Sequence, residues 1–227
     1  LKIYIIEQES EREDYDELPK FLKQPGTRMA KFNLGRLKNI GFHIASQDQS
    51  SLAYYVLSDV DMLPSEGLIP SYLQYPKTPI HLGHMGTRYG HDGRDFLGGV
   101  ISFRQEDFET VNGYPNNFWG WGGEDDCLIY RLKETKIKVS KPEEPVIDLE
   151  ELTIKEKKAI LNQQKAKGDQ YFEQRDNDKQ TWRENGLSDL EGSYDILSTE
   201  DYNDDEDVKH IIVKLKVTEE DKQVYRS

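Results

Sequence analysis

The sequence predicts an α/β fold, because strand-like apolar runs alternate with a helical segment in its first third. Residues 1–7 and 52–57 are rich in β-branched and aromatic side chains, as buried strands are. Between them, residues 30–46 repeat Leu and Ile at the spacing of a helix with one apolar face. A strand, a helix and a second strand in this order are typical of open α/β sheets.

The middle of the chain continues this alternation after a charged surface loop and a long Pro- and Gly-containing excursion. We expect three short strands and two helices there, the strands at 78–82, 98–103 and 136–140 and the helices at 104–110 and 124–134.

The last third is more polar. Residues 143–180 predict a charged insertion with one exposed helix, at about 152–167. Residues 200–207 suggest a calcium loop, but Glu206 and Ile212 stand where an EF-hand needs glycine and an acid, so we expect an acidic turn. Residues 209–217 predict a closing strand whose lysines suit a sheet edge. Residues 1–227 are expected to form a single domain.

Composition limits the class of protein. The net charge of −13 argues against binding to a nucleic-acid backbone, which requires Lys and Arg. No apolar run approaches the roughly 20 residues that span a bilayer, so we expect no membrane segment in this chain. Cys127 is the only cysteine and no Asn-x-Ser/Thr site occurs, which favours a reducing compartment or a non-secretory host. Leu1 in place of Met suggests a fragment of a longer chain.

Residues 112–126 are the most unusual stretch. Two tryptophans and four glycines lead into three consecutive acids, Glu124, Asp125 and Asp126. Glycine allows close approach of a ligand, and tryptophan offers a flat apolar face with one N–H donor. Adjacent carboxylates repel one another unless a cation, a hydroxyl-rich ligand or a proton transfer uses them. The acids alone would also suit the start of a helix, but that explanation leaves the paired tryptophans unexplained.

A second acidic site follows the second predicted strand. Asp59 and Asp61 lie two residues apart just beyond it, at the edge where open α/β sheets bind ligands. If the strand continued, both carboxylates would point the same way and could hold Mg²⁺ or Mn²⁺ on a diphosphate. A polar strand end with an Asx turn is the alternative. Three histidines, His81, His84 and His91, are interpreted as loop residues rather than metal ligands.

These blocks, in this order, resemble the β-1,4-galactosyltransferase family (glycosyltransferase family 7). The resemblance rests on residues 32–42, 58–61, 98–100 and 112–126, and most specifically on Trp-Gly-Trp-Gly-Gly-Glu-Asp-Asp. It implies a GT-A fold, a Rossmann-like mixed sheet flanked by helices. Residues 1–7 match the family's second strand, so the resemblance implies that this chain lacks the family's first strand, which lines the uridine and phosphate pocket.

The family implies inverting transfer of a hexose from a UDP-sugar to a carbohydrate acceptor with Mn²⁺ or Mg²⁺. Carried over to matching positions, it makes Asp125 the general base, supported by Glu124 and Asp126. It assigns donor binding to Asp59, Asp61, Phe32, Gly99 and Trp121, with Asp61 also a metal ligand. It assigns acceptor binding to Trp121, Gly122, Gly123 and Asp125. Two separate acidic sites agree with this chemistry, which needs a base and a Lewis acid.

Two further departures concern the metal and the donor. The family's metal-binding histidine has no counterpart, since no histidine occurs between His91 and His210. Asp148, Glu150 or Glu151 could supply oxygen ligands instead, which suit Mg²⁺ and Mn²⁺. Phe96 stands where a tyrosine usually tunes galactose against N-acetylgalactosamine, which leaves the donor sugar open.

Two other functions are compatible with the same residues. One is a catalytically weak or inactive GT-A domain that binds glycans or serves as a scaffold, which the missing strand and histidine would favour. The other, a simple acidic cation-binding protein, explains neither the tryptophans nor the order of the blocks. Family members usually act in the Golgi lumen, whereas the lack of an anchor and of glycosylation sites would fit a cytoplasmic or viral enzyme.

Overall fold

The computed structural model describes residues 1–24, 26–47, 53–87, 96–156, 159, 169–219 and 221. The chain forms two compact units, each assembled from separate stretches of the sequence. Unit 1 comprises Leu1–Gln47, Tyr114–Glu124 and Ala166–Ser227, and unit 2 comprises Asp48–Gly113 and Asp125–Lys165. The Trp-Gly block therefore belongs to unit 1 up to Glu124, and Asp125 is the first residue of the next stretch of unit 2.

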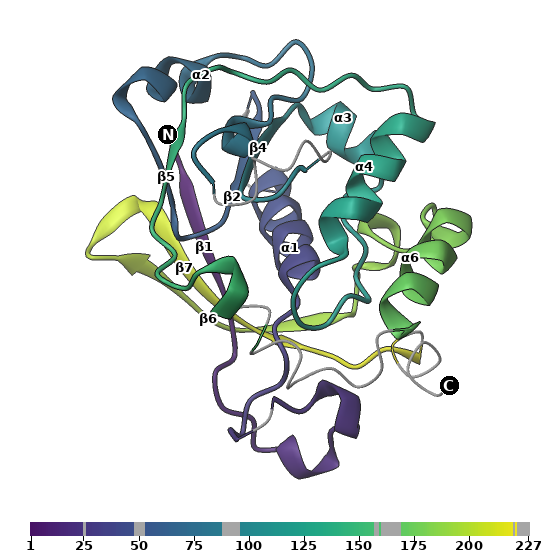
Figure 1. The fold of residues 1–227 in the computed structure, drawn as a ribbon. Helices are drawn as coiled ribbons and strands as arrows, with labels where there is room; N and C mark the ends of the chain where they lie inside the picture. Colours follow the sequence, from purple (N-terminus) through teal and green to yellow (C-terminus); the bar gives the residue numbers. More distant parts are fainter. Residues whose placement is uncertain are drawn as a thin grey trace. The chain divides into compact units, whose positions relative to one another are not determined.

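Unit 1 is built on a mixed three-stranded sheet with the order β1-β7-β6 (Figure 1). β1 (Ile3–Gln8) runs parallel to β7 (Asp205–Leu215), and β6 (Tyr194–Tyr202) runs antiparallel to β7. Asn203 and Asp204 join β6 to β7 with positive φ, the conformation that tight hairpins require. The acidic turn expected at 200–207 is thus the tip of this hairpin.

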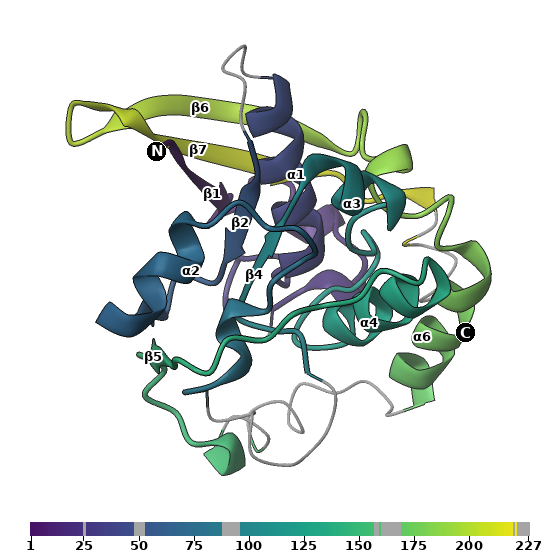
Figure 2. The ribbon, with the colours of Figure 1, turned by 90° about the horizontal axis from the view of Figure 1, so that it is seen from above.

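Helix α1 (Leu34–Gln47) covers one face of this sheet, as Figure 2 shows from above. Its side chains Leu37 and Ile40 belong to the same buried cluster as Ile211 and Val213 of β7. The helix approaches β1 closely at Gly41, where an added Cβ would lie 3.1 Å from Cγ1 of Ile6. Alternate residues of β7 point into this core, as the twofold periodicity of a strand requires.

Helix α6 (Asp169–Thr181) also belongs to unit 1 and was not predicted, because it carries few apolar residues. A polar contact attaches it to the Trp-Gly block, since buried Gln174 donates a hydrogen bond to the Asn117 carbonyl at 2.6 Å. Trp182, just beyond the helix, is buried.

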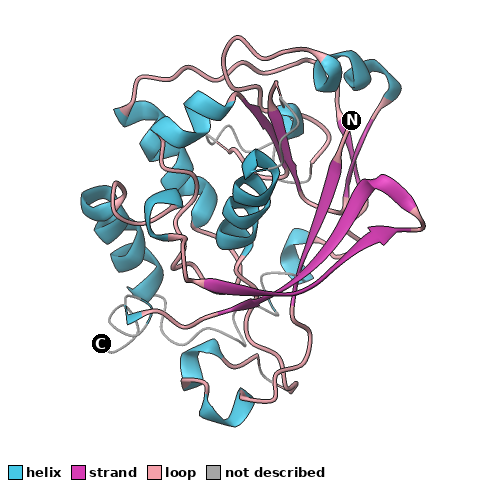
Figure 3. Cartoon of the chain, turned by 180° about the vertical axis from the view of Figure 1, so that it is seen from behind, coloured by secondary structure: helices cyan, strands magenta, loops and turns pink. Residues whose placement is uncertain are grey.

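Unit 2 contains two pairs of short antiparallel strands (Figure 3). β2 (Tyr55–Ser58) pairs with β4 (Val100–Phe103), and β3 (Met62–Pro64) pairs with β5 (Val146–Asp148). Its core combines Met62, Leu68, Ile80, Leu82, Val100 and Val146. Its helices include α2 (Ile69–Leu73), α3 (Gln105–Thr110) and α4 (Glu124–Glu134), of which α4 begins at the last residue of unit 1. Single 3₁₀ turns occur at Tyr15–Glu17, Lys20–Leu22, Glu66–Leu68, Leu82–His84 and Leu187–Asp189.

The α/β class and most predicted elements are confirmed. The helices expected at 30–46, 104–110 and 124–134 correspond to α1, α3 and α4, and the strands at 1–7, 52–57 and 98–103 to β1, β2 and β4. β1 is not fully buried, however, because Ile3 and Ile5 on its outer face are exposed. Residue 52 lies outside the described residues.

Other predictions were wrong. In place of strands at 78–82 and 136–140, Ile80 forms isolated bridges to Ser102 and Ser140. The closing strand is central rather than at an edge, and its lysines face acids instead: Lys214 lies 3.4 Å from Asp14, and Lys209 pairs with Asp201 of β6. Of the helix expected at 152–167, residues 154–156 and 159 are helical, Leu152 and Thr153 are not, and the others lie outside the described residues.

Within the part of the chain that the structure describes, no helix has the length and apolar character needed to cross a membrane.

Candidate active site

The two acids after β2 lie in a turn rather than on a continuing strand. β2 ends at Ser58 and β3 begins at Met62, whose N–H donates to the Asp59 carbonyl at 3.3 Å. The expectation that strand alternation would align Asp59 and Asp61 is therefore wrong. The turn is attached to the Gly98–Gly99 segment instead, because the Asp59 N–H donates to the Gly99 carbonyl at 2.9 Å.

The Asp125 carboxylate lies directly against Gly98. A Cβ added to Gly98 would lie 2.5 Å from Oδ2 of Asp125, which is closer than real Cβ contacts allow. Gly99 has a φ of +81°, in the region that glycine tolerates best. The predicted base in the first turn of α4 and the predicted donor-side turn are thus brought together within unit 2, although 27 residues separate Gly98 from Asp125.

The buried His81 side chain contacts the backbone of the Gly98–Gly99 turn, a role that the sequence did not reveal. Its ring is fully buried, and its Nε2 lies 3.0 Å from the Gly98 carbonyl. Because a carbonyl only accepts, Nε2 must carry the proton. The Phe96 ring meets the His81 ring edge-to-face at 5.6 Å between centroids. His81 thus lies in a loop, as expected, and its buried ring has a structural role there.

The two neighbouring histidines differ from His81. For His84, burial and the nearby charge of Lys141 lower the pKa below its ordinary value, so the ring favours the neutral form. His91 lies outside the described residues.

Arg131 fixes α4 to the end of α3. Its guanidinium is fully buried and donates hydrogen bonds at 3.0 Å to the carbonyls of Asn112 and Gly113. Both of these residues have positive φ where the chain leaves α3. Asp125 lies about 1.7 turns earlier on the same helix, so this clamp contributes to its placement.

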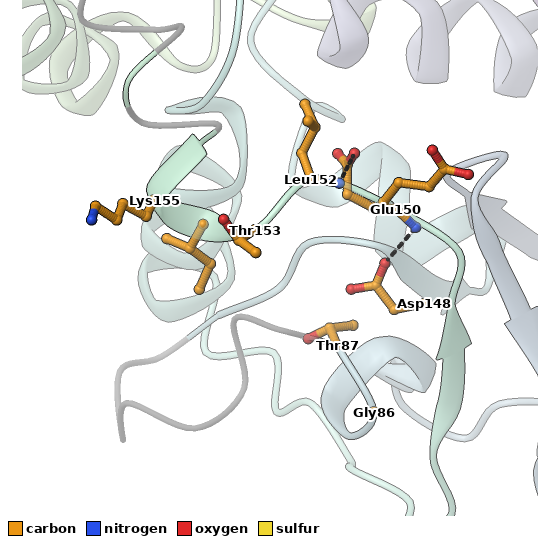
Figure 4. Close-up of a pocket in the computed structure, with 9 residues that line it drawn as sticks. Gly86, Thr87, Asp148, Glu150, Leu152, Thr153 and Lys155 are labelled. Atoms are coloured by element: carbon orange, nitrogen blue, oxygen red, sulfur yellow. Dashed lines mark hydrogen bonds between the residues drawn. The ribbon is translucent and has the colours of Figure 1, made fainter.

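Asp148 is the last residue of β5 and Glu150 follows it, beside the Asp59–Asp61 turn. Asp148 is the register partner of Met62, and the Leu149 N–H donates to the Asp61 carbonyl at 2.9 Å. One Asp148 oxygen accepts the Glu150 N–H at 3.0 Å, and the Asp148 side chain lines the pocket drawn in Figure 4. This pocket of about 600 Å³ is lined by Gly86, Thr87, Asp148, Glu150, Glu151, Leu152, Thr153, Ile154 and Lys155.

The oxygen ligands here suit a hard cation. Among the described residues, no group of three or more His, Cys, Asp or Glu side chains is arranged to hold a metal ion. Mg²⁺ and Mn²⁺ need only one or two protein carboxylates when phosphate oxygens and water complete the shell. Asp61 and Asp148, at the ends of two paired strands, fit that requirement.

The remaining predicted residues belong to unit 1. Phe32 is half exposed, and its carbonyl accepts the Gly120 N–H at 2.7 Å. Trp121 is 48% exposed whereas Trp119 is 7% exposed, so the two tryptophans lie in different environments. Gly122 and Gly123 both have positive φ, with the chain turning sharply before α4 begins at buried Glu124. Asp126 is partly buried in the first turn of α4, in unit 2.

Comparison with known proteins identifies the same family along the chain. A family model described as the N-terminal domain of galactosyltransferase matches residues 78–156. The chain is 36% identical to Chinese hamster (Cricetulus griseus) β-1,4-galactosyltransferase 4 over 123 residues, covering 53% of this chain and 34% of that protein. It is 32% identical to mouse (Mus musculus) β-1,4-galactosyltransferase 1 over 184 residues, covering 80% of this chain and 43% of that protein. The chain thus spans well under half the length of these curated relatives.

Solved structures with this fold include two of Drosophila β-1,4-galactosyltransferase 7, each at 22% identity and covering 99% of this chain and 100% of the other. One is of a mutant in complex with manganese, UDP-Gal and xylobiose, with a TM-score of 0.60, and the other is of the catalytic domain with xylobiose, with a TM-score of 0.58. The structural similarity shows the GT-A fold, and the sequence matches indicate the family. The chain belongs to the β-1,4-galactosyltransferase family.

Proposed function

We propose that this chain carries out metal-dependent inverting transfer of galactose, or of a related hexose or N-acetylhexosamine, from a UDP-sugar to a glycan hydroxyl. The family assignment supports a glycosyltransferase, and the manganese, UDP-Gal and xylobiose bound by the Drosophila enzyme support this donor, cofactor and acceptor class. The observation that carries the proposal is the close contact between the Asp125 carboxylate and Gly98. The next residue, Gly99, accepts a hydrogen bond from the Asp59 N–H, so the proposed base and the proposed donor-binding turn are neighbours.

The proposed chemistry is a single displacement. The Asp125 carboxylate accepts the proton of the acceptor hydroxyl as that oxygen bonds to the anomeric carbon of the sugar. The bond from this carbon to the diphosphate oxygen breaks on the opposite side, which inverts the anomeric centre. Gly98 leaves room for the base, and Gly99 leaves room for the donor beside Asp59.

Asp61 would hold the divalent cation, together with Asp148 or Glu150 after β5. When bound, the cation neutralises charge that develops on the leaving diphosphate. Trp121 offers an apolar face for a sugar ring, and Gly122 and Gly123 give the backbone of this loop the freedom to close over bound sugars. Glu124 and Asp126 would hold sugar hydroxyls.

UDP release tests this function directly. Release would be measured from UDP-galactose, UDP-N-acetylgalactosamine and UDP-glucose with and without Mn²⁺, which also addresses the donor preference left open at Phe96. We expect metal-dependent release that falls at least about 10³-fold in Asp125→Asn, because the base is lost. Glu106→Gln, an acid in the first turn of α3 in the same unit, is the matched control and should keep wild-type activity.

A second candidate function is a GT-A domain that binds glycans without turnover. The observation that favours it is the lack of a counterpart to the family's metal-binding histidine, since no histidine occurs between His91 and His210. Calorimetric binding of a glycan, combined with no UDP release from any of the three donors, would favour this alternative over the transferase.

A further inference from the structure

A buried ion pair lies at the base of the loop that carries Trp121. Arg36 of α1 and Asp221 near the end of the chain are 3.1 Å apart, and both side chains are almost completely buried. Trp119 joins the pair, because its Nε1–H donates to Oδ1 of Asp221 at 2.7 Å. The Arg36 guanidinium also lies over the Trp119 ring, 5.1 Å from its centroid.

Both side chains of this ion pair form further hydrogen bonds. Arg36 donates from Nε to the Asn116 carbonyl at 2.9 Å and from Nη1 to the Lys216 carbonyl at 2.8 Å. Oδ2 of Asp221 accepts the N–H of Thr218 at 2.8 Å and its hydroxyl at 3.0 Å. Buried charges destabilise a fold unless they are paired and hydrogen-bonded in this way. The network joins three segments of unit 1 that are far apart in the sequence.

The Trp121 loop begins at this network. Trp119 is locked by Asp221, and the next residue, Gly120, donates its N–H to the Phe32 carbonyl at 2.7 Å. Beyond this second attachment, Gly122 and Gly123 have positive φ and Trp121 is half exposed. The loop thus has a fixed base and a short glycine-rich tip.

We propose that Asp221, held by Arg36, is a positioning residue for Trp121 that acts through Trp119. The inference rests on the proposed function, in which Trp121 covers the bound sugar. A fixed base leaves only a few residues to be ordered when the loop closes, which lowers the entropic cost of binding the acceptor. The end of the chain, outside the family-model match at residues 78–156, would then contribute to acceptor affinity.

A purely structural role would make a different prediction. Loss of Asp221 would then lower the stability of unit 1 without a selective effect on Trp121 or on the acceptor. The matched control is Asp14→Asn, which removes a carboxylate 2.9 Å from another buried arginine of unit 1, Arg12, at a site with no contact to the Trp121 loop. Trp119→Phe is the second variant, because it removes the indole N–H and leaves the ion pair in place.

The experiment uses the full chain labelled with 5-fluorotryptophan, whose three ¹⁹F resonances are assigned through Trp182→Phe and Trp119→Phe. We expect Asp221→Asn and Trp119→Phe to shift or broaden the Trp121 resonance, with the Trp182 resonance unchanged, and Asp14→Asn to alter neither. In steady-state kinetics, the acceptor KM should rise on the order of 10-fold in Asp221→Asn while the donor KM stays within about twofold. The effect of the double variant should be smaller than the sum of the two single effects, because both changes act on the contact between Trp119 and Asp221.

An unchanged Trp121 resonance in both variants overturns the inference, as does equal loss of donor and acceptor affinity. If the wild-type chain releases no UDP from any donor, the proposed function fails, and the ¹⁹F comparison alone still decides whether Asp221 positions Trp121. If the wild type releases UDP but Asp221→Asn and Trp119→Phe behave like the control Asp14→Asn, this inference fails and the proposed function stands.

Discussion

Asn39 forms both main-chain hydrogen bonds of Tyr114. Its Oδ1 accepts the Tyr114 N–H at 2.9 Å, and its Nδ2 donates to the Tyr114 carbonyl at 2.7 Å. The same Nδ2 reaches Oδ1 of Asn116 at 2.9 Å. One fully buried side chain of α1 thus fixes the start of the 114–124 segment to the core of unit 1, much as a strand partner would.

Replacement of this clamp should destabilise the protein strongly. Asn39→Ala removes a hydrogen-bond partner from both the N–H and the carbonyl of buried Tyr114, and each such loss costs roughly 1–3 kcal/mol. We expect the free energy of unfolding in urea to fall by about 2–4 kcal/mol. Asn177→Ala, on the exposed face of α6, should change it by less than about 0.5 kcal/mol. Equal effects of the two changes would contradict the role of Asn39.

Gly98→Ala tests the close contact between Gly98 and the Asp125 carboxylate. The new Cβ would lie 2.5 Å from Oδ2 of Asp125 and 2.5 Å from Cε2 of Phe96, so the carboxylate must move. A displacement of about 1 Å costs on the order of 10²-fold in rate, and we expect that loss in kcat for UDP-sugar transfer. Gly67→Ala is the control, because its Cβ would meet only the flexible end of Glu144, at 2.6 Å from Oε2. A wild-type kcat in Gly98→Ala would show that this contact does not position Asp125 for the reaction.

His81 should be replaceable by a residue that keeps its N–H. His81→Phe removes the donor to the Gly98 carbonyl and should lower the free energy of unfolding by about 1–3 kcal/mol, because a buried carbonyl loses its partner. His81→Gln retains a donor and should restore part of this loss. Chemical denaturation of the three proteins measures the difference. Identical stabilities for Phe and Gln would show that the hydrogen bond is unimportant.

Asp148→Ala tests the oxygen ligands of the proposed cation site. If Asp148 holds the cation with Asp61, the Mn²⁺ concentration that gives half-maximal UDP release should rise by at least about 10-fold. Glu143→Ala, an exposed acid on the same segment, should leave the metal titration unchanged. A titration of Asp148→Ala that superimposes on the wild type would exclude this residue as a ligand and leave Glu150 as the candidate.

The stability of unit 1 should depend on pH through Asp14. A hydrogen bond from Arg12 lowers the pKa of Asp14 to about 2, below its unfolded value of about 3.9. A depressed folded-state pKa stabilises the fold above the unfolded pKa, and this contribution is lost as the pH falls from about 4 to 2. Because Asp14 is partly exposed, Asp14→Asn should lower the free energy of unfolding by only about 1 kcal/mol at pH 7, and by nearly nothing at pH 2. A pH-independent difference would contradict this assignment.

The sequence alone determined the elements that depend on local periodicity. The boundaries of α4 were predicted at 124–134 and are observed there, and α1, α3 and β4 differ by a few residues at most at either end. The order of the acidic and glycine-rich blocks was sufficient to recognise the family, because a block such as residues 119–126 is specific without any coordinates. Helical spacing and motif order are properties of neighbouring residues, so they can be read from the chain.

Tertiary structure decided everything that depends on contacts between distant residues. It moved β7 to the centre of its sheet, since strand order follows from pairing with β1 and β6 and not from the lysines of β7 itself. It buried Trp119 and left Trp121 half exposed, and it brought the His81 ring within hydrogen-bond distance of the Gly98 carbonyl. It also placed Asp125 on Gly98. Burial and close approach arise only when the chain is packed, so no local pattern in the sequence encodes them.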